Sequence, residues 1–138
     1  TVAEHSYLID EFLMMLHDKG ELELEFHGAA KKVLFHGHCH QKALAGTASS
    51  MRALSLPPGY QVEQVNAGCC GMAGAFGFER EHFDISMSIG GQALFPAVSA
   101  KDLDWEVAVT GVSCRQQIEQ GTGRAARHLV EILRDALV

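Results

Sequence analysis

The sequence predicts an α/β domain built on a mostly parallel sheet. Three short apolar runs, at residues 33–35, 60–65 and 105–109, are each followed by a stretch of helical composition. Parallel neighbouring strands must be joined by crossover connections, and these connections have the composition of helices. Each run also ends in a turn that contains cysteine. Because sheets of this kind hold ligands at the carboxyl ends of their strands, we expect the thiols to meet at one edge.

The N-terminal part is expected to add a helix and an outer strand to this core. Residues 21–26 alternate Glu with Leu or Phe, which is typical of a strand with one exposed face. Residues 3–18 form an amphipathic pattern that Gly20 ends, and its apolar positions at helical spacing are Leu8, Phe12, Met15 and Leu16.

The first strand-helix unit carries the densest group of metal-ligating side chains. The strand at 33–35 leads directly into the sequence HGHCH at 36–40, and a helix is predicted for residues 41–56, closed by the PPG sequence at 57–59. The second strand, at 60–65, leads into a glycine-rich loop at 67–78.

Two further helices complete the second and third units. A helix is predicted from about residue 79, in which Gly90 and Gly91 indicate either a weak point or close packing. Ser113 and Gln116 after the third strand form a capping-box pattern, which places Cys114 in the first turn of a helix. The expected buried faces are Phe83, Met87 and Leu94 in the first helix, and Ala125, Leu129, Ile132, Leu133 and Ala136 in a C-terminal helix.

Length and charge limit the function classes. With 138 residues and 15.0 kDa, the chain is expected to be one domain, residues 1–138. Its net charge of −6 without any basic run argues against nucleic acid or anionic membranes as main partners. No apolar run reaches the length of a membrane span, and we expect a cytoplasmic location. Since the chain begins with Thr1, we expect a fragment of a larger polypeptide.

The loop AGCCGMAGAFGF at 67–78 is the most informative stretch. It places Cys69 and Cys70 between two glycines, which let a backbone approach a ligand closely. Cys39 lies 30 residues before this pair and Cys114 lies 44 residues after it, so we interpret the four as one site. Thiolates are metal ligands, and Cys114 at a helix N-terminus is expected to favour the thiolate.

Four thiolates suit an iron-sulfur cluster and a tetrahedral zinc ion equally well. A weaker alternative is a thiol oxidoreductase that cycles Cys69 and Cys70 through a vicinal disulfide. Buried cysteine can also be only a small apolar residue.

Histidines and arginines near the cysteines are further candidates. His36, His38 and His40 alternate, so they would point to one side of an extended chain, and His38 and His40 rank first as metal ligands because they flank a cysteine. Arg115 and Arg124 would offset the charge of an anionic cluster. Structural roles are expected for His5, His17, His27, His82 and His128.

Three motifs carry a family resemblance: HCHQKAL at 38–44, GCCGMAG at 68–74 and SCRQQIEQGTGR at 113–124. They resemble the cysteine-rich CCG domain found in the B subunit of heterodisulfide reductase, the iron-sulfur subunit of glycolate oxidase and the C subunit of anaerobic glycerol-3-phosphate dehydrogenase. More specifically, they look like the C-terminal part of fused proteins in which an FAD-linked D-2-hydroxy acid dehydrogenase precedes an iron-sulfur oxidoreductase. The resemblance runs from about Leu8 to about Leu137.

The resemblance implies that Cys39, Cys69, Cys70 and Cys114 hold an iron-sulfur cluster, with 4Fe-4S as the expected type and zinc as the alternative. Heterodisulfide reductase has a C-x-x-C motif at the position of Cys114. In this chain Gln117 replaces the second cysteine of that motif. A five-thiolate cluster therefore cannot be carried over, and a four-thiolate cluster, a zinc ion and a site completed by His38 or His40 are all open.

The implied function is an electron-transfer domain of a flavin-dependent 2-hydroxy acid dehydrogenase, such as one for D-lactate, glycolate or D-2-hydroxyglutarate, with no catalytic residue of its own. FAD would belong to another part of the polypeptide, since no dinucleotide fingerprint is present here. The implied partners are that flavin domain, a second iron-sulfur or CCG region, and a membrane electron acceptor reached by peripheral association. A zinc-binding docking module of the same complex is the alternative function.

Overall fold

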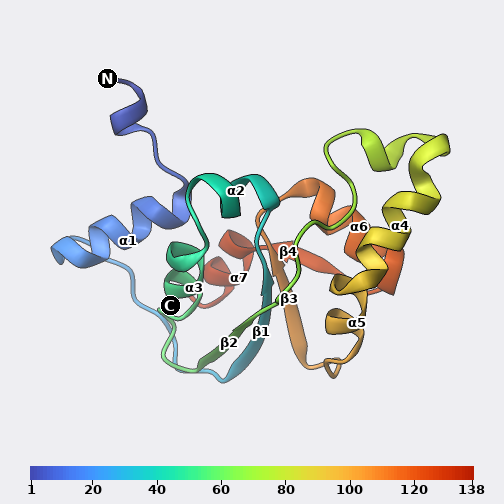
Figure 1. Cartoon of the computed structure of the whole chain (residues 1–138). Helices are drawn as coiled ribbons and strands as arrows, with labels where there is room; N and C mark the ends of the chain where they lie inside the picture. Colours follow the sequence, from blue (N-terminus) through green and yellow to red (C-terminus); the bar gives the residue numbers. More distant parts are fainter.

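A four-stranded, fully parallel sheet lies between two layers of helices in the computed structural model, which describes residues 1–138 (Figure 1). The strand order is β2-β1-β3-β4. The predicted α/β class with a mostly parallel sheet is therefore confirmed. The strands are β1 (Lys31–His36), β2 (Tyr60–Gln64), β3 (Trp105–Val109) and β4 (Ala126–His128).

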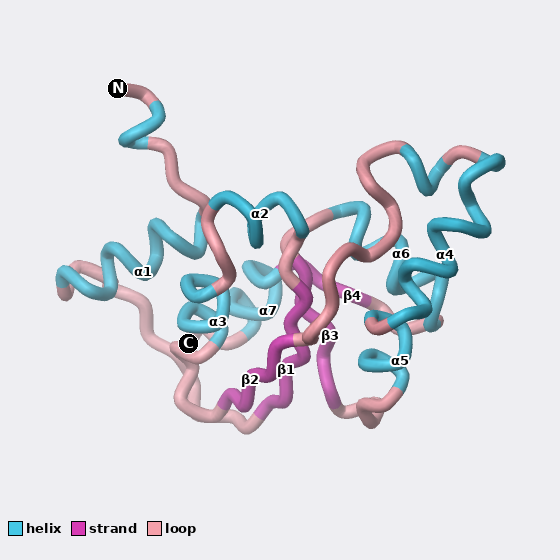
Figure 2. The backbone as a smooth tube through the Cα atoms, viewed as in Figure 1, coloured by secondary structure: helices cyan, strands magenta, loops and turns pink.

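Helices cover both faces of the sheet. α1, α3 and α7 lie on one side of it, and α4, α5 and α6 lie on the other (Figures 1 and 2). No helix in the structure combines the length and the apolar character that a membrane span requires. The helices are α1 (Ile9–Lys19), α2 (Cys39–Leu44), α3 (Ala48–Leu54), α4 (Phe83–Gln92), α5 (Leu94–Ser99), α6 (Val112–Thr122) and α7 (Leu129–Asp135).

Strand alternation divides the core into two clusters, because successive side chains point to opposite faces of a sheet. Val33 and Phe35 of β1 are fully buried on the side of α1, α3 and α7, with Met14, Leu54 and Ile132. The second cluster lies on the other face, and its members include Leu34, Val107, Val109, Leu94, Val98, Ile118, Cys70 and Cys114.

The predicted outer strand at 21–26 is wrong. Phe26 forms only one isolated antiparallel bridge, with Leu137, and the neighbouring backbone bonds join His27 to Ala136 and Val138 to Glu25. An alternating pattern needs a partner strand along its length, and here the partner is only the short tail that follows α7.

Several helix boundaries also differ from the sequence expectation. The helix predicted for 41–56 is two helices, α2 and α3, separated by a turn at 45–47. The C-terminal helix is shorter than expected, because residues 126–128 form β4 along the free edge of β3. In α1 the buried residues are Asp10 and Met14, whereas Leu8 before it and Phe12 within it are 43% and 40% exposed.

The packing of Phe95 explains the glycines in α4. A Cβ atom added at Gly90 would lie 2.4 Å from the Phe95 ring, and one added at Gly121 of α6 would lie 2.3 Å from it. The aromatic ring therefore fits between two helices only because both positions lack a side chain. Gly90 marks close packing, and the buried face of α4 is Ser86 and Gly90 in place of the expected Phe83, which is 38% exposed.

We expect Phe35→Ala to lower the free energy of unfolding by about 3–5 kcal/mol, since Phe35 is fully buried in the central strand. Urea unfolding followed by circular dichroism measures this change. Leu103→Ala is the control: Leu103 is 88% exposed, so the expected change is within about 0.5 kcal/mol. Equal effects of the two substitutions would contradict the assigned core.

Candidate functional site

The carboxyl ends of β1, β2 and β3 bring the four cysteines into one region. Cys39 begins α2 directly after β1, Cys69 and Cys70 lie in the loop after β2, and Cys114 lies in the first turn of α6 after β3. All four are free thiols. A hollow of about 410 Å³ lies at this edge. It is lined by Ser113 and by residues that follow β1 and β2: His38, Cys39, His40, Cys69, Cys70, Ala73 and Gly74.

Cys114 does not line this hollow, and its thiol is hydrogen-bonded to that of Cys70. Both side chains are nearly inaccessible to solvent, whereas Cys39 and Cys69 are half-buried. The hydrogen bond with Cys114 lowers the pKa of Cys70 to about 6, and the backbone N–H groups of Met72 and Cys70 also favour this thiolate. Within this hydrogen-bonded pair, the thiolate form is therefore favoured at Cys70.

The expectation that its helix position makes Cys114 a thiolate is wrong for the metal-free pair. The hydrogen bond that Cys114 makes with Cys70 and its own burial both raise the pKa of Cys114. The predicted capping box is also wrong, because α6 begins at Val112 and its N-cap is Gly111. Cys114 still lies in the first helical turn, as predicted.

Close backbone packing holds the loop that carries Cys69 and Cys70. Gly71 has φ = +99°, and a Cβ atom added to it would lie 2.2 Å from the carbonyl oxygen of Ser86 in α4. The Gln117 Nε2 of α6 donates to the Ser86 carbonyl and to the Ser86 hydroxyl, both at 3.0 Å. Gln117 is therefore a buried structural residue that ties α6, α4 and the loop together. The Gly71 N–H donates to the Cys69 sulfur at 3.3 Å.

Lys42 supplies a cation that sequence reasoning missed. Its Nζ donates to the carbonyl oxygens of Ala67 and Gly68, at 2.5 and 3.2 Å, directly before the paired cysteines. The predicted helix began at residue 41, and only the observed start of α2 at Cys39 places Cys39 and Lys42 three residues apart on one helix.

Arg115 and Arg124, which the sequence suggested as cations near the cysteines, form their contacts elsewhere. The Arg115 side chain pairs with Glu119 on the exposed face of α6. Arg124 donates to backbone carbonyls that include those of Lys101 and Trp105, at the start of β3. This position is at the end of the strand opposite to the cysteines, so an electrostatic role for Arg124 at the site is not supported.

The three alternating histidines occupy different environments. The His38 Nδ1 accepts the backbone N–H of His40 at 3.2 Å as the N-cap of α2, and the two rings lie edge to face. Burial lowers the pKa of His38, and neighbouring His40 lowers it further. His40 is exposed. His36 is fully buried, and neither of its ring nitrogens has a hydrogen-bond partner.

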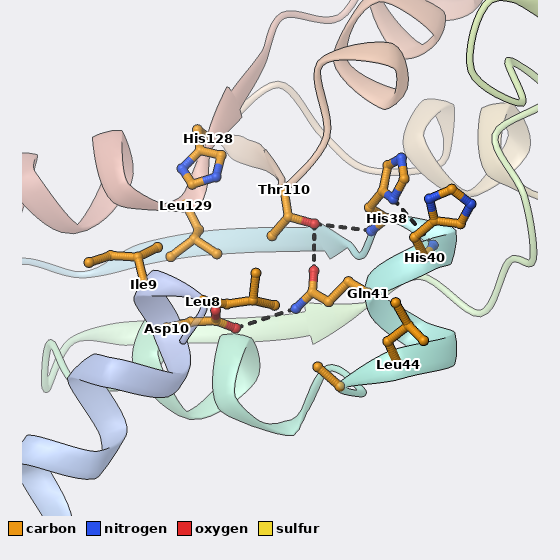
Figure 3. A pocket seen from close by; sticks show the side chains of 11 residues that line it. Leu8, Ile9, Asp10, His38, His40, Gln41, Leu44, Thr110, His128 and Leu129 are labelled. Atoms are coloured by element: carbon orange, nitrogen blue, oxygen red, sulfur yellow. Dashed lines mark hydrogen bonds between the residues drawn. The ribbon is translucent and has the colours of Figure 1, made fainter. Parts of the chain in front are cut away.

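A second cavity, of about 370 Å³, adjoins the hollow through His38 and His40 (Figure 3). Its wall contains a buried polar chain in which the Thr110 hydroxyl donates to Gln41 at 2.6 Å, and Gln41 donates to Asp10 at 3.3 Å. The Thr110 hydroxyl also accepts the His38 backbone N–H at 3.0 Å. This chain ties the first turn of α1 to the exits of β1 and β3.

The thiols at this edge are soft donors of the kind that bind an iron-sulfur cluster or a zinc ion. No group of three or more His, Cys, Asp or Glu side chains is arranged around one ion position. Cys39, Cys69 and Cys70 line a hollow of about 410 Å³, and Cys114 is hydrogen-bonded to Cys70. Soft thiolate donors and an unpartnered buried imidazole are a donor set compatible with an iron-sulfur cluster.

Comparison with known proteins relates the chain to parts of dehydrogenases. It is 29% identical over 136 residues to the C subunit of anaerobic glycerol-3-phosphate dehydrogenase from Escherichia coli K12, covering 99% of this chain and 34% of that protein. It is 35% identical over 100 residues to D-2-hydroxyglutarate dehydrogenase of the same strain, covering 72% of this chain and 10% of that protein. The Pantoea ananatis D-2-hydroxyglutarate dehydrogenase is 34% identical over 97 residues, covering 70% of this chain and 9% of that protein.

The chain thus spans about a third of the length of the glycerol-3-phosphate dehydrogenase subunit and about a tenth of the length of the D-2-hydroxyglutarate dehydrogenases. No known family model matches it, and no solved structure matches it. The chain is homologous to portions of proteins that are dehydrogenases or components of dehydrogenases.

We expect one thiolate of the metal-free chain to titrate with a midpoint near pH 6, followed by its ultraviolet absorbance. Cys70→Ser should abolish this transition. Cys114→Ala should move the midpoint upward, because it removes the thiol that stabilises the thiolate. The pKa of Cys70 is lower in the folded than in the unfolded chain, so its stabilising effect is lost as pH falls through about 6. A transition that Cys70→Ser leaves unchanged would contradict the assignment.

We expect Gly71→Ala to destabilise the chain by about 1–3 kcal/mol, because alanine at φ = +99° is strained and its Cβ meets the Ser86 carbonyl. Gly68→Ala is the matched control in the same loop, since a Cβ atom there meets nothing within 4 Å. Chemical denaturation measures both variants. A Gly71→Ala protein as stable as Gly68→Ala would contradict the described loop conformation.

Proposed function

We propose that this chain is the iron-sulfur electron-transfer domain of a larger flavin-dependent dehydrogenase that acts on 2-hydroxy acids. The observation that carries the proposal is the gathering of four free cysteines, from three separate strand exits, at one edge of the sheet. Nothing in the packing of an ordinary core requires four thiols at the place where parallel sheets bind ligands.

The relatives support the larger setting. They include one component of a dehydrogenase and complete dehydrogenases for D-2-hydroxyglutarate, which is a 2-hydroxy acid. Since the chain corresponds to a minor part of each, flavin and substrate would be bound by other parts of the polypeptide or complex. The electrons would come from reduced flavin there and leave to an acceptor outside this chain.

The four thiols have distinct roles in holding such a centre. Cys70 is already ionised near neutral pH, and Cys114, its hydrogen-bond partner, would lose its proton when metal replaces that bond. Cys39 and Cys69 are half-buried at the mouth of the hollow. The Gly71 N–H bond to the Cys69 sulfur is of the kind that raises the reduction potential of a bound cluster.

A cluster bound by these residues supplies one-electron transfer. The partial exposure of Cys39 and Cys69 would bring the centre near the surface, within reach of a neighbouring redox domain. Burial of Cys70 and Cys114 would protect its other side from water.

The arrangement favours a cluster over zinc. Zinc-sulfur bonds of about 2.3 Å place the sulfur atoms of a tetrahedral site about 3.8 Å apart. No three metal-ligating side chains here are arranged around one ion position, whereas a cluster of several atoms accepts ligands that lie farther apart.

Anaerobic reconstitution of the 138-residue chain with ferrous iron and sulfide tests the proposal. We expect a broad visible absorption from thiolate-to-iron charge transfer and an EPR signal in the paramagnetic state. Cys39→Ser, Cys69→Ser, Cys70→Ser and Cys114→Ser should each lower the iron content per chain at least severalfold. Ser113→Ala is the matched control, because it removes a polar side chain of the same hollow without removing a thiol.

Two results would refute the proposal. One is a wild-type chain that takes up no iron and sulfide, or takes them up no better than Cys70→Ser. The other is a chain that binds one zinc ion per molecule, remains colourless after reconstitution and loses zinc in the cysteine variants, which would favour a zinc-binding docking module.

A further inference from the structure

His36 at the end of β1 is a buried polar side chain without a partner. Its exposed fraction is 0%, and neither Nδ1 nor Nε2 forms a hydrogen bond. Buried polar side chains are nearly always hydrogen-bonded, because leaving one unpaired destabilises the folded state. An imidazole kept in this state therefore indicates a partner that the polypeptide itself does not provide.

The strand geometry places His36 on the cysteine side of the sheet. Side chains alternate along β1, so His36 shares a face with Leu34 and faces away from Phe35. Its register partner on β3 is Val109, and both Leu34 and Val109 belong to the core cluster that also contains Cys70 and Cys114. The cluster on the opposite face contains Phe35 and no cysteine.

His36 also lies between the two strand exits that carry these cysteines. β1 is the strand between β2 and β3, and His36 is its last residue. The loop with Cys70 follows β2, and the turn leading to Cys114 follows β3. The imidazole therefore lies at the carboxyl edge of the sheet, on the face that carries Cys70 and Cys114.

No neighbouring group of the chain forms a hydrogen bond with the His36 imidazole. The nearby cation, Lys42, is held by the carbonyls of Ala67 and Gly68, and the His38 ring caps α2. Both ring nitrogens of His36 are therefore left without a partner among the side chains and backbone around them.

We propose that His36 is a fifth donor to the metal centre of the four cysteines, binding iron through one imidazole nitrogen. This assignment rests on the proposed function, and it differs from the sequence expectation, which ranked His38 and His40 first. His40 is exposed and the Nδ1 of His38 is engaged, whereas His36 is the histidine whose two nitrogens are buried and free.

Pulsed EPR of the reconstituted chain tests this donor. The cluster is assembled anaerobically from ferrous iron and sulfide in chains with ordinary or ¹⁵N-labelled histidine. We expect a nitrogen hyperfine coupling that changes with the label in the wild type and is lost in His36→Leu. The coupling should persist in the matched controls His38→Ala and His40→Ala. His36→Leu should also weaken cluster retention roughly tenfold against an iron chelator.

The metal-free chain distinguishes a ligand from a structural residue. Because His36 is unpaired there, His36→Leu should raise the midpoint of thermal unfolding of the metal-free protein. A lowered midpoint together with unchanged cluster retention and unchanged nitrogen coupling would overturn the proposal. A cluster that forms without any histidine nitrogen coupling overturns the His36 assignment alone, whereas a wild type that forms no cluster overturns the proposed function as well.

Discussion

Parallel pairing of β1 with both β2 and β3 is the constraint on which the rest of this structure depends. Parallel strands all point their carboxyl ends to the same edge, so the three chain segments that leave them must share that edge. Residues separated by 30 and 44 positions in sequence thereby become neighbours. The turns have little room, and this explains why Gly71 lies directly against the Ser86 carbonyl while Gln117 bonds to the same residue.

Charge at this edge is arranged around one negative thiolate. Cys70 holds it with help from the Cys114 thiol and backbone N–H groups, and the side chain of Lys42 lies bonded to carbonyls of the same loop. Two buried thiolates would repel one another without a cation between them, so the second proton stays on Cys114. Under the proposed function, metal binding would resolve this repulsion and would couple uptake of a centre to proton release.

Local patterns predicted the elements whose form depends on nearby residues. The apolar runs at β1, β2 and β3, the glycine-rich loop and the helical position of Cys114 were all evident from short stretches. Elements that depend on distant partners were missed. β4 exists because three residues pair with the free edge of β3, and the segment 21–26 lacks such a partner. Likewise, Asp10 has the sequence context of a surface residue of a helix, yet Gln41 and Ser50 bond to it in the interior.

The amino-acid order specifies the chemistry available to this protein: four thiols, three histidines beside one of them, and a strand-helix order that sends every thiol to the same edge. Packing of the folded chain then selects which of these groups are buried, paired or free. Ionisation of Cys70 over Cys114, the structural use of Gln117 and the unpartnered state of His36 each depend on atoms contributed by other elements. The physical reason is that burial and hydrogen bonding are properties of packed neighbours, which residue spacing along the chain does not specify.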